Sequence, residues 1–201
     1  IQQHKMGWSP SREMLIFPIF GADKDLIAWQ GRGFKKEGLK YLNNKGAVSD
    51  ILHIIGIKEN KHNIVIVTED LLSSIKVGRL YRTMPLWGSN LPMKAVRRLS
   101  SQFSGLGIWL DRDKSKEALV AALRASQFIP TFVINSYLDP KEYSTEQIQS
   151  FVQDSIKHTV YGDIVPLNDF PIAELEENCQ KYPWEKVKEM YPSLNLSYPD
   201  Y

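Results

Sequence analysis

The stretch Ile64-Val-Ile-Val-Thr-Glu69 decides how this chain is organised. Four β-branched residues in a row, Ile64 to Val67, favour a buried strand, and polar pairs at residues 62–63 and 69–70 bound it. Apolar residues at helical spacing then continue to Tyr81. The stretch therefore predicts a buried strand that ends in an acidic residue and leads into a helix.

The same alternation continues along the middle of the chain. The apolar runs 84–87, 107–110 and 131–134 are predicted strands, and the amphipathic segments 92–103 and 116–128 are predicted helices. Short apolar strands that alternate with helices are typical of a parallel sheet covered on both faces. The predicted fold class is therefore α/β.

The two ends of the chain have different patterns. Met14–Phe20 and Leu26–Phe34 are apolar runs joined by a turn-rich segment, which predicts a hairpin, and Pro18 favours an edge position or a bulge. After Asp139 we expect helices without strands, the first over 146–156 with Thr145 as its N-cap and a second over 173–181. We therefore predict a β-rich N-terminal subdomain (1–60), an α/β domain (61–140) and a helical C-terminal tail (141–201).

Composition excludes several classes of protein. The 201 residues are 43% apolar and 24% charged, which is ordinary for a globular protein, and the net charge of +2 does not by itself imply a polyanionic partner. A single cysteine excludes a disulfide framework and every Cys-rich zinc module, and it fits a reducing compartment. No apolar run approaches the length of a membrane span. The tryptophans at 8, 29, 87 and 109 lie in or beside predicted strands, so we expect them in the core.

Acidic residues stand at the ends of three predicted strands. Glu69 follows the first, Asp111 and Asp113 follow the strand at 107–110, and Asp139 comes shortly after the last. Ligand sites of parallel α/β sheets form outside the carboxyl ends of the strands, and residues two apart on an extended segment point to the same side. Two carboxylates that close repel each other unless a divalent cation neutralises them, and Mg²⁺ prefers such oxygen ligands. The simpler alternative is that Asp113 and Asp70 are helix N-caps.

The order of these acidic strand ends along the chain resembles the Toprim domain, which DnaG-type primases share with type IA and II topoisomerases and some nucleases. The likeness rests on a strand ending in Glu69, a later strand ending in Asp111-Arg-Asp113, and the turn Leu86-Trp-Gly-Ser89 between them. Flanking segments narrow the resemblance to a primase core of phage type, over roughly residues 6–155. They are Leu15-Ile-Phe-Pro-Ile19, Ala28-Trp-Gln-Gly-Arg32, Leu39-Lys-Tyr-Leu-Asn43 and Leu138-Asp-Pro-Lys-Glu-Tyr143.

The resemblance implies a Toprim Rossmann-like sheet and the synthesis of short RNA primers on a single-stranded DNA template from nucleoside triphosphates. It implies Mg²⁺ or Mn²⁺ as cofactor, a replicative helicase as partner, no membrane, and the cytoplasm (of the host, for a phage protein) as location. Its catalytic residues would be Glu69, Asp111 and Asp113, with Glu69 as either a metal ligand or the base near the attacking hydroxyl. The implied metal ligands are Glu69, Asp111, Asp113 and Asp139, and the implied contacts to template or nucleotide are Arg32, Lys40, Lys94 and Arg97.

Two positions depart from the primase pattern. Ser73 stands where primases usually have an acidic residue four after the glutamate, and Lys141 replaces a second acidic residue after Asp139. Two other functions therefore remain open: a Toprim nuclease, in which the metal activates water, and a non-catalytic module that binds single-stranded nucleic acid. Because the chain begins at Ile1 and has no zinc module, we expect a catalytic core cut from a longer protein.

Overall fold

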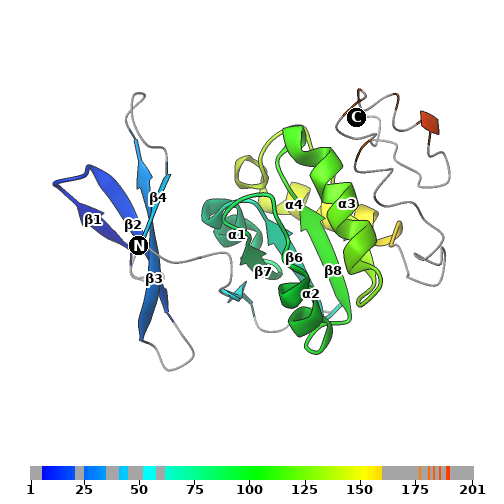
Figure 1. Ribbon diagram of the computed structural model, residues 1–201, viewed down its shortest axis with the longest axis horizontal. Coiled ribbons are helices and arrows are strands. Elements are labelled where there is room, and N and C mark those ends of the chain that lie inside the picture. Colours follow the sequence, from blue (N-terminus) through cyan, green and yellow to red (C-terminus); the bar gives the residue numbers. More distant parts are fainter. Residues whose placement is uncertain are drawn as a thin grey trace. The chain divides into compact units, whose positions relative to one another are not determined.

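The structure is a computed structural model, and it describes residues 6–20, 25–34, 41–44, 52–57 and 62–159, together with residues 177, 181, 183, 186, 189 and 190. The chain divides into two compact units, which we call the N-terminal unit (1–53) and the C-terminal unit (54–201). Figure 1 labels most of their helices and strands.

The N-terminal unit is an antiparallel sheet in the order β1-β2-β3-β4. Its strands are β1 (Gly7–Ser9), β2 (Met14–Phe20), β3 (Leu26–Gly33) and β4 (Tyr41–Asn43). The predicted hairpin is confirmed as the pairing of β2 with β3. Pro18 fits because β1 pairs with residues 14–16 only, and because the register shifts between Ile19 and Phe20. Trp8 lies on the edge strand β1 with 54% of its side chain exposed, so its predicted place in the core is wrong.

The C-terminal unit contains a five-stranded sheet in the order β5-β7-β6-β8-β9. Its strands are β5 (Ile55–Gly56), β6 (Ile64–Thr68), β7 (Arg82–Pro85), β8 (Gly105–Trp109) and β9 (Thr131–Val133). The last four are parallel, which confirms the predicted α/β fold class, and β5 is antiparallel to β7. The division between the units therefore falls before β5, whereas the sequence placed it at residue 60.

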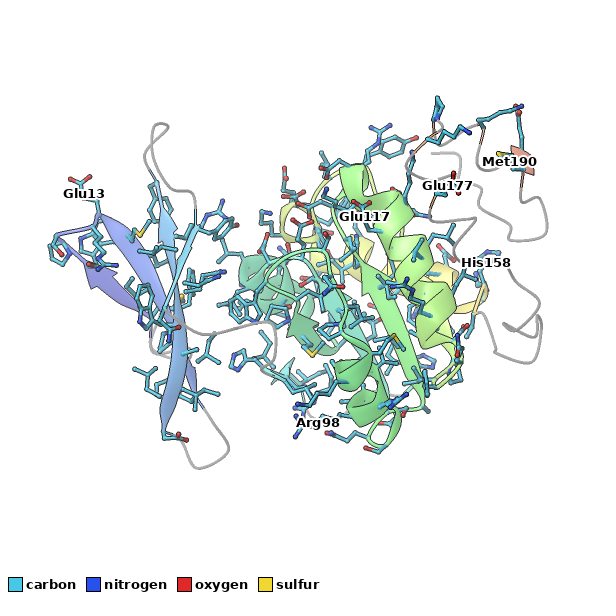
Figure 2. The ribbon with its side chains drawn as sticks, in the orientation of Figure 1. Glu13, Arg98, Glu117, His158, Glu177 and Met190 are labelled. Atoms are coloured by element: carbon cyan, nitrogen blue, oxygen red, sulfur yellow. The ribbon has the colours of Figure 1, made fainter. Side chains whose placement is uncertain are left out.

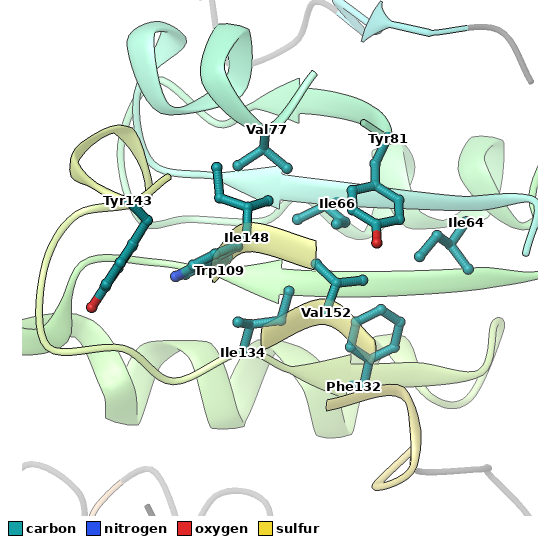
Figure 3. Close-up of a cluster of buried hydrophobic side chains, with 10 residues drawn as sticks. All are labelled: Ile64, Ile66, Val77, Tyr81, Trp109, Phe132, Ile134, Tyr143, Ile148 and Val152. Carbon is teal, nitrogen blue, oxygen red and sulfur yellow. The ribbon is translucent and has the colours of Figure 1, made fainter. Parts of the chain in front are cut away.

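Helices cover both faces of this sheet (Figure 1). They are α1 (Leu71–Val77), α2 (Met93–Ser100), α3 (Ser115–Ala125) and α4 (Thr145–Ile156), with short 3-10 turns at η3 (Arg112–Lys114) and η4 (Pro140–Glu142). On one face, Ile66 and Trp109 pack with Val77 of α1 and with Ile148 and Val152 of α4. Figure 3 shows this cluster, in which α4 closes the core. The helix predicted in the C-terminal tail is thus an integral part of the C-terminal unit.

Two details of this core follow from individual residues. A side chain at Gly107 would meet the ring of Phe132 at 2.8 Å, so only glycine lets β8 and β9 pack this closely. The N-cap of α4 is Ser144, not the predicted Thr145, because Ser144 and Gln147 form a reciprocal capping box. The second predicted tail helix lies largely outside the described residues, although Glu177 and Lys181 within it are helical. Among the described residues, no helix has the length and apolar character needed to cross a bilayer.

Candidate functional site

Five carboxylates gather where the central strands of the parallel sheet end. Strands β6, β8 and β9 are neighbours that run in the same direction, so the segments after them meet at one edge of the sheet. We call the set that follows them the acidic edge: Glu69, Asp70, Asp111, Asp113 and Asp139. The structure thus brings all four predicted metal ligands to one edge and adds Asp70 to them.

Glu69 lies where its charge is poorly compensated. Burial and the neighbouring charge of Asp113 raise the pKa of the Glu69 carboxyl above its usual value, against the lowering effects of Lys114 and of a hydrogen bond from the Asp111 backbone. Its Oε2 atom is buried and has no hydrogen-bond partner among the described residues. A buried carboxylate oxygen without a donor is costly unless a cation approaches it.

Asp111 experiences the same environment more strongly. Burial, and then the charges of Glu69 and Asp139, raise the pKa of Asp111 to about 6. These side chains are therefore close enough to repel one another. Such mutual repulsion is the electrostatic condition that a divalent cation relieves.

The simpler explanation, that these aspartates are helix caps, holds for only one of them. Asp70 caps α1, because its Oδ1 accepts a hydrogen bond from the Ser73 backbone at 2.9 Å. Asp111 precedes η3 without any side-chain capping bond, and the residue before α3 is Lys114 rather than Asp113. Capping therefore leaves Asp111 and Asp113 unexplained.

Lys141 is part of the site, although its position in the sequence indicated only a missing carboxylate. Its Nζ lies 2.9 Å from Oδ2 of Asp70 and also contacts Oδ2 of Asp139. Burial alone would lower the pKa of Lys141, but hydrogen bonds to Asp139 and then Asp70 raise it above its usual value. The ammonium therefore stays charged. No sequence signal identifies its partner Asp70, which lies 71 residues earlier.

The loop after β9 is held rigidly beside the acidic edge. Ser136 is buried, and its Oγ accepts a hydrogen bond from Trp109 Nε1 at 2.8 Å and donates one to the Leu138 carbonyl at 2.8 Å. The Tyr143 hydroxyl accepts a hydrogen bond from the Leu138 backbone at 2.9 Å. These bonds fix the backbone that leads into Asp139.

That rigid loop presents an aromatic ring to solvent. Tyr137 is 50% exposed, and the guanidinium carbon of Arg112 lies 4.6 Å from the centre of its ring. Arg112 stands between Asp111 and Asp113 in the chain. An exposed aromatic ring in contact with an arginine thus lies next to the acidic edge. The sequence did not indicate that Tyr137 and Arg112 belong to the site.

Of the predicted basic contacts, two belong to the N-terminal unit. Lys40 lies outside the described residues. Arg32 donates a hydrogen bond to the Tyr41 hydroxyl, and its guanidinium lies 5.0 Å from the centre of that ring. Tyr41 therefore orients Arg32 within its own sheet.

The other two predicted contacts, Lys94 and Arg97, are three residues apart on α2, which is about one helical turn. Lys94 lies in the first turn of this helix and Arg97 in its last turn. The guanidinium carbon of Arg97 lies 5.2 Å from the centre of the Phe128 ring, and Phe128 comes just before the start of β9. Figure 2 places its neighbour Arg98 at the end of the sheet opposite Glu117, which follows the acidic edge. The structure does not bring Arg97 together with the carboxylates.

The donor set of the acidic edge suits a hard divalent cation. Among the described residues, no group of three or more His, Cys, Asp or Glu side chains is arranged to enclose a metal ion. Mg²⁺ does not require such an enclosure, because it usually binds through one or two carboxylates and keeps water or phosphate oxygens as its other ligands. The unpartnered Oε2 of Glu69 and the half-buried Asp111 are oxygen donors of this kind.

Comparison with known proteins identifies the fold. No family model and no curated protein matches the chain, whereas solved primase structures do. A DNA primase domain from Pseudomonas aeruginosa is 16% identical with a TM-score of 0.56, over 76% of this chain and 56% of that one. Aquifex aeolicus primase, with its zinc-binding and RNA polymerase domains, is 15% identical with a TM-score of 0.58, over 92% and 52%. A DnaG primase catalytic domain bound to single-stranded DNA is 15% identical with a TM-score of 0.57, over 74% and 52%.

These matches establish that the chain has the fold of the DnaG-type primase catalytic core, as the sequence resemblance implied. The chain spans about half the length of the first structures that it matches, between 52% and 56%. At identities of 15–17%, the similarity concerns the fold and carries no statement about activity.

Proposed function

We propose that this chain is a primase catalytic core that synthesises short RNA primers on single-stranded DNA by metal-dependent nucleotidyl transfer. The observation that carries the proposal is the acidic edge, where Glu69 and Asp111 have raised pKa values because burial and mutual repulsion are not compensated. The fold shared with primase catalytic cores supports the same assignment.

Glu69, Asp111 and Asp113 would hold Mg²⁺ or Mn²⁺ at this edge, one or two of them directly and the remainder through water molecules of the ion. When bound, the ion neutralises charge on the nucleotide triphosphate and orients its phosphates. The chain itself contributes the placement of these carboxylates, because β6 and β8 are paired and rigid. Glu69, whose carboxyl group has a raised pKa, is also suited to accept the proton of the attacking 3′-hydroxyl. Both roles of Glu69 remain open in this proposal.

Tyr137 and Arg112 would hold a base of the nucleotide or of the template next to these carboxylates. An exposed ring can stack on any nucleobase, and a guanidinium beside it attracts both the base and the phosphate backbone. The fixed loop around Ser136 supports this role, because a stacking surface binds best when it is already ordered. Arg32, Lys40 and Lys94 remain proposed contacts to phosphates. A replicative helicase as partner, a phage-type origin and a cytoplasmic location also remain predictions of the resemblance.

A primer-synthesis assay on mixed-sequence single-stranded DNA tests the proposal. With nucleoside triphosphates and MgCl₂, we expect short RNA products from the wild-type chain. Asp111→Asn and Asp113→Asn should each lower the primer yield by at least about a hundredfold. Loss of a residue that only supports a metal ligand already lowers activity by about 10- to 100-fold, and loss of a ligand itself should have a larger effect. Asp154→Asn is the matched control, since Asp154 is an exposed residue of α4 that pairs with Lys157.

The same reaction separates the other functions. Shortening of a labelled DNA strand would identify a nuclease, and binding of DNA without either product would identify a non-catalytic module. Yields near the wild-type level from Asp111→Asn or Asp113→Asn would reject the assignment of the site.

A further inference from the structure

Lys141 connects two carboxylates that come from different parts of the C-terminal unit. It lies on η4, which packs against α1, and its Nζ contacts both Asp70 at the start of α1 and Asp139 at the start of η4. The side chains of Lys141, Asp70 and Asp139 are 23%, 12% and 30% exposed. This ion pair is therefore shielded far more than a surface salt bridge.

The acidic edge thus divides into two sets of carboxylates. Asp70 and Asp139 share the ammonium of Lys141, and Asp70 also accepts the Ser73 N–H. These two carboxylates are compensated by groups of the chain itself.

The second set is Glu69, Asp111 and Asp113. Lys114 acts on Glu69, but its side chain is 34% exposed and bonds to Glu117 at 3.3 Å. Lys141 acts electrostatically on Asp111, although its ammonium is held by Asp70 and Asp139. Lys114 therefore neutralises this set only weakly, and Glu69 keeps a buried oxygen without a donor among the described residues. This is the set at which an added cation gains the most.

We propose that Lys141 takes the place of a second divalent cation at the acidic edge. The site would then take up one divalent cation, at Glu69, Asp111 and Asp113, and Asp139 would not be one of its ligands. A cation arriving between Asp70 and Asp139 would have to displace a tethered ammonium that already satisfies both. This inference rests on the metal site of the proposed function and specifies how many cations it holds.

Counting bound Mn²⁺ tests the proposal without any measurement of catalysis. Isothermal titration calorimetry and the electron paramagnetic resonance signal of free Mn²⁺ should give one ion per wild-type chain. Lys141→Gln removes the ammonium while keeping a polar side chain, and we expect its count to rise by one. Lys141→Arg, which keeps the charge, should behave as wild type.

Lys114→Gln is the matched control, because it removes the same charge from the same edge without a contact to Asp70 or Asp139, and its count should not change. A Lys141→Gln chain with an unchanged count, or a wild-type chain that binds two ions, overturns the proposal.

A second pair of variants covers the case in which Lys141→Gln does not fold. In an otherwise wild-type chain, Asp139→Asn should keep the single ion with an affinity within about threefold, whereas Asp111→Asn should lose it. Loss of the ion from Asp139→Asn would make Asp139 a ligand and would overturn the proposal.

The outcomes for the two proposals are distinct. A chain that binds its one ion but makes no primers contradicts the proposed function alone. A wild-type chain that binds no ion contradicts the proposed metal site, and the gain of an ion by Lys141→Gln still decides the role of the lysine.

Discussion

The fold places Asp111 where the charged form of its side chain is disfavoured. Burial and the charges of Glu69 and Asp139 raise its pKa to about 6 in the folded protein, whereas a solvated aspartate in the unfolded chain titrates near about 3.9. Between these values the folded state binds more protons than the unfolded state, so its stability falls as the pH rises. This change of stability with pH has the opposite sign to that caused by a carboxylate in a salt bridge.

We therefore predict a loss of stability between about pH 4 and pH 6 in the absence of divalent cations. The contribution of Asp111 should be on the order of 1 kcal/mol, after allowance for the solvent that screens a half-buried group. Urea titrations in EDTA across this range measure it, and Asp111→Asn should flatten the curve. Asp154→Asn, on the exposed surface of α4, should leave the decline in place. Equal declines in the wild type and Asp111→Asn would contradict the prediction.

Tyr137 provides a second test at the scale of a single residue. Tyr137→Ala should weaken binding of a fluorescent single-stranded oligonucleotide by about 1–3 kcal/mol, because a stacked base loses its aromatic partner. Tyr137→Phe keeps the ring and should bind as wild type. Fluorescence anisotropy at fixed salt concentration gives both affinities.

Phe128 is the control for this change, because it is also an exposed aromatic residue beside an arginine. It is 39% exposed and lies 5.2 Å from the guanidinium carbon of Arg97, but at the opposite end of the sheet from the carboxylates. Phe128→Ala should leave oligonucleotide binding unchanged. Equal losses from Tyr137→Ala and Phe128→Ala would show that neither ring marks the binding site.

Helix α4 shows which properties of an element can be predicted from its local sequence and which depend on tertiary packing. The helix was predicted almost to the residue, because its apolar positions repeat at helical spacing and Ile148 and Val152 are buried. Its N-cap was misassigned by one position, although Ser144 and Gln147 have the spacing of a capping box. What the sequence did not indicate is that α4 packs into the core of the sheet instead of forming a tail.

The cap of α4 leads to a prediction at this scale. Ser144→Ala should lower the free energy of unfolding by about 1 kcal/mol, because the Gln147 N–H loses the Ser144 Oγ that accepts its hydrogen bond. Ser150→Ala, on the exposed face of the same helix, should change it by less than about 0.5 kcal/mol. Urea denaturation measures both variants. A Ser144→Ala variant as stable as Ser150→Ala would show that the capping box does not support the helix.

At the scale of the whole molecule, the chain covers about half of the primase structures that it resembles. If it is a catalytic core, it should extend a supplied dinucleotide better than it initiates from mononucleotides. Initiation must hold two nucleotides in register at once, whereas extension starts with that step completed. The single cysteine of this sequence cannot supply the Cys-rich zinc module that normally helps primases to start.

The two reactions should be compared on one template at saturating MgCl₂. We expect a yield from the dinucleotide at least about tenfold higher, which corresponds to about 1.4 kcal/mol of barrier. Equal yields would show that the chain carries its own means of initiation.

The order of strands and helices could be predicted from the amino-acid sequence, as could the parallel character of the main sheet and the acidic residues at its strand ends. These features depend on burial patterns that repeat every two or 3.6 residues, and such patterns are visible within a short window. The strand Ile55–Gly56 was not predicted, because two residues are too few to show a period and pairing with β7 decides their place.

The balance of charges at the site could not be predicted from the sequence, because it depends on contacts that form on folding. Lys141 and Asp70 are 71 residues apart, and they meet because η4 packs against α1. The loop that carries Tyr137 is likewise fixed by distant residues, because Ser136 accepts a hydrogen bond from Trp109 and the Tyr143 hydroxyl accepts one from the Leu138 N–H. The energy of a charge depends on its distance from other charges and from water, and folding sets those distances independently of separation along the chain.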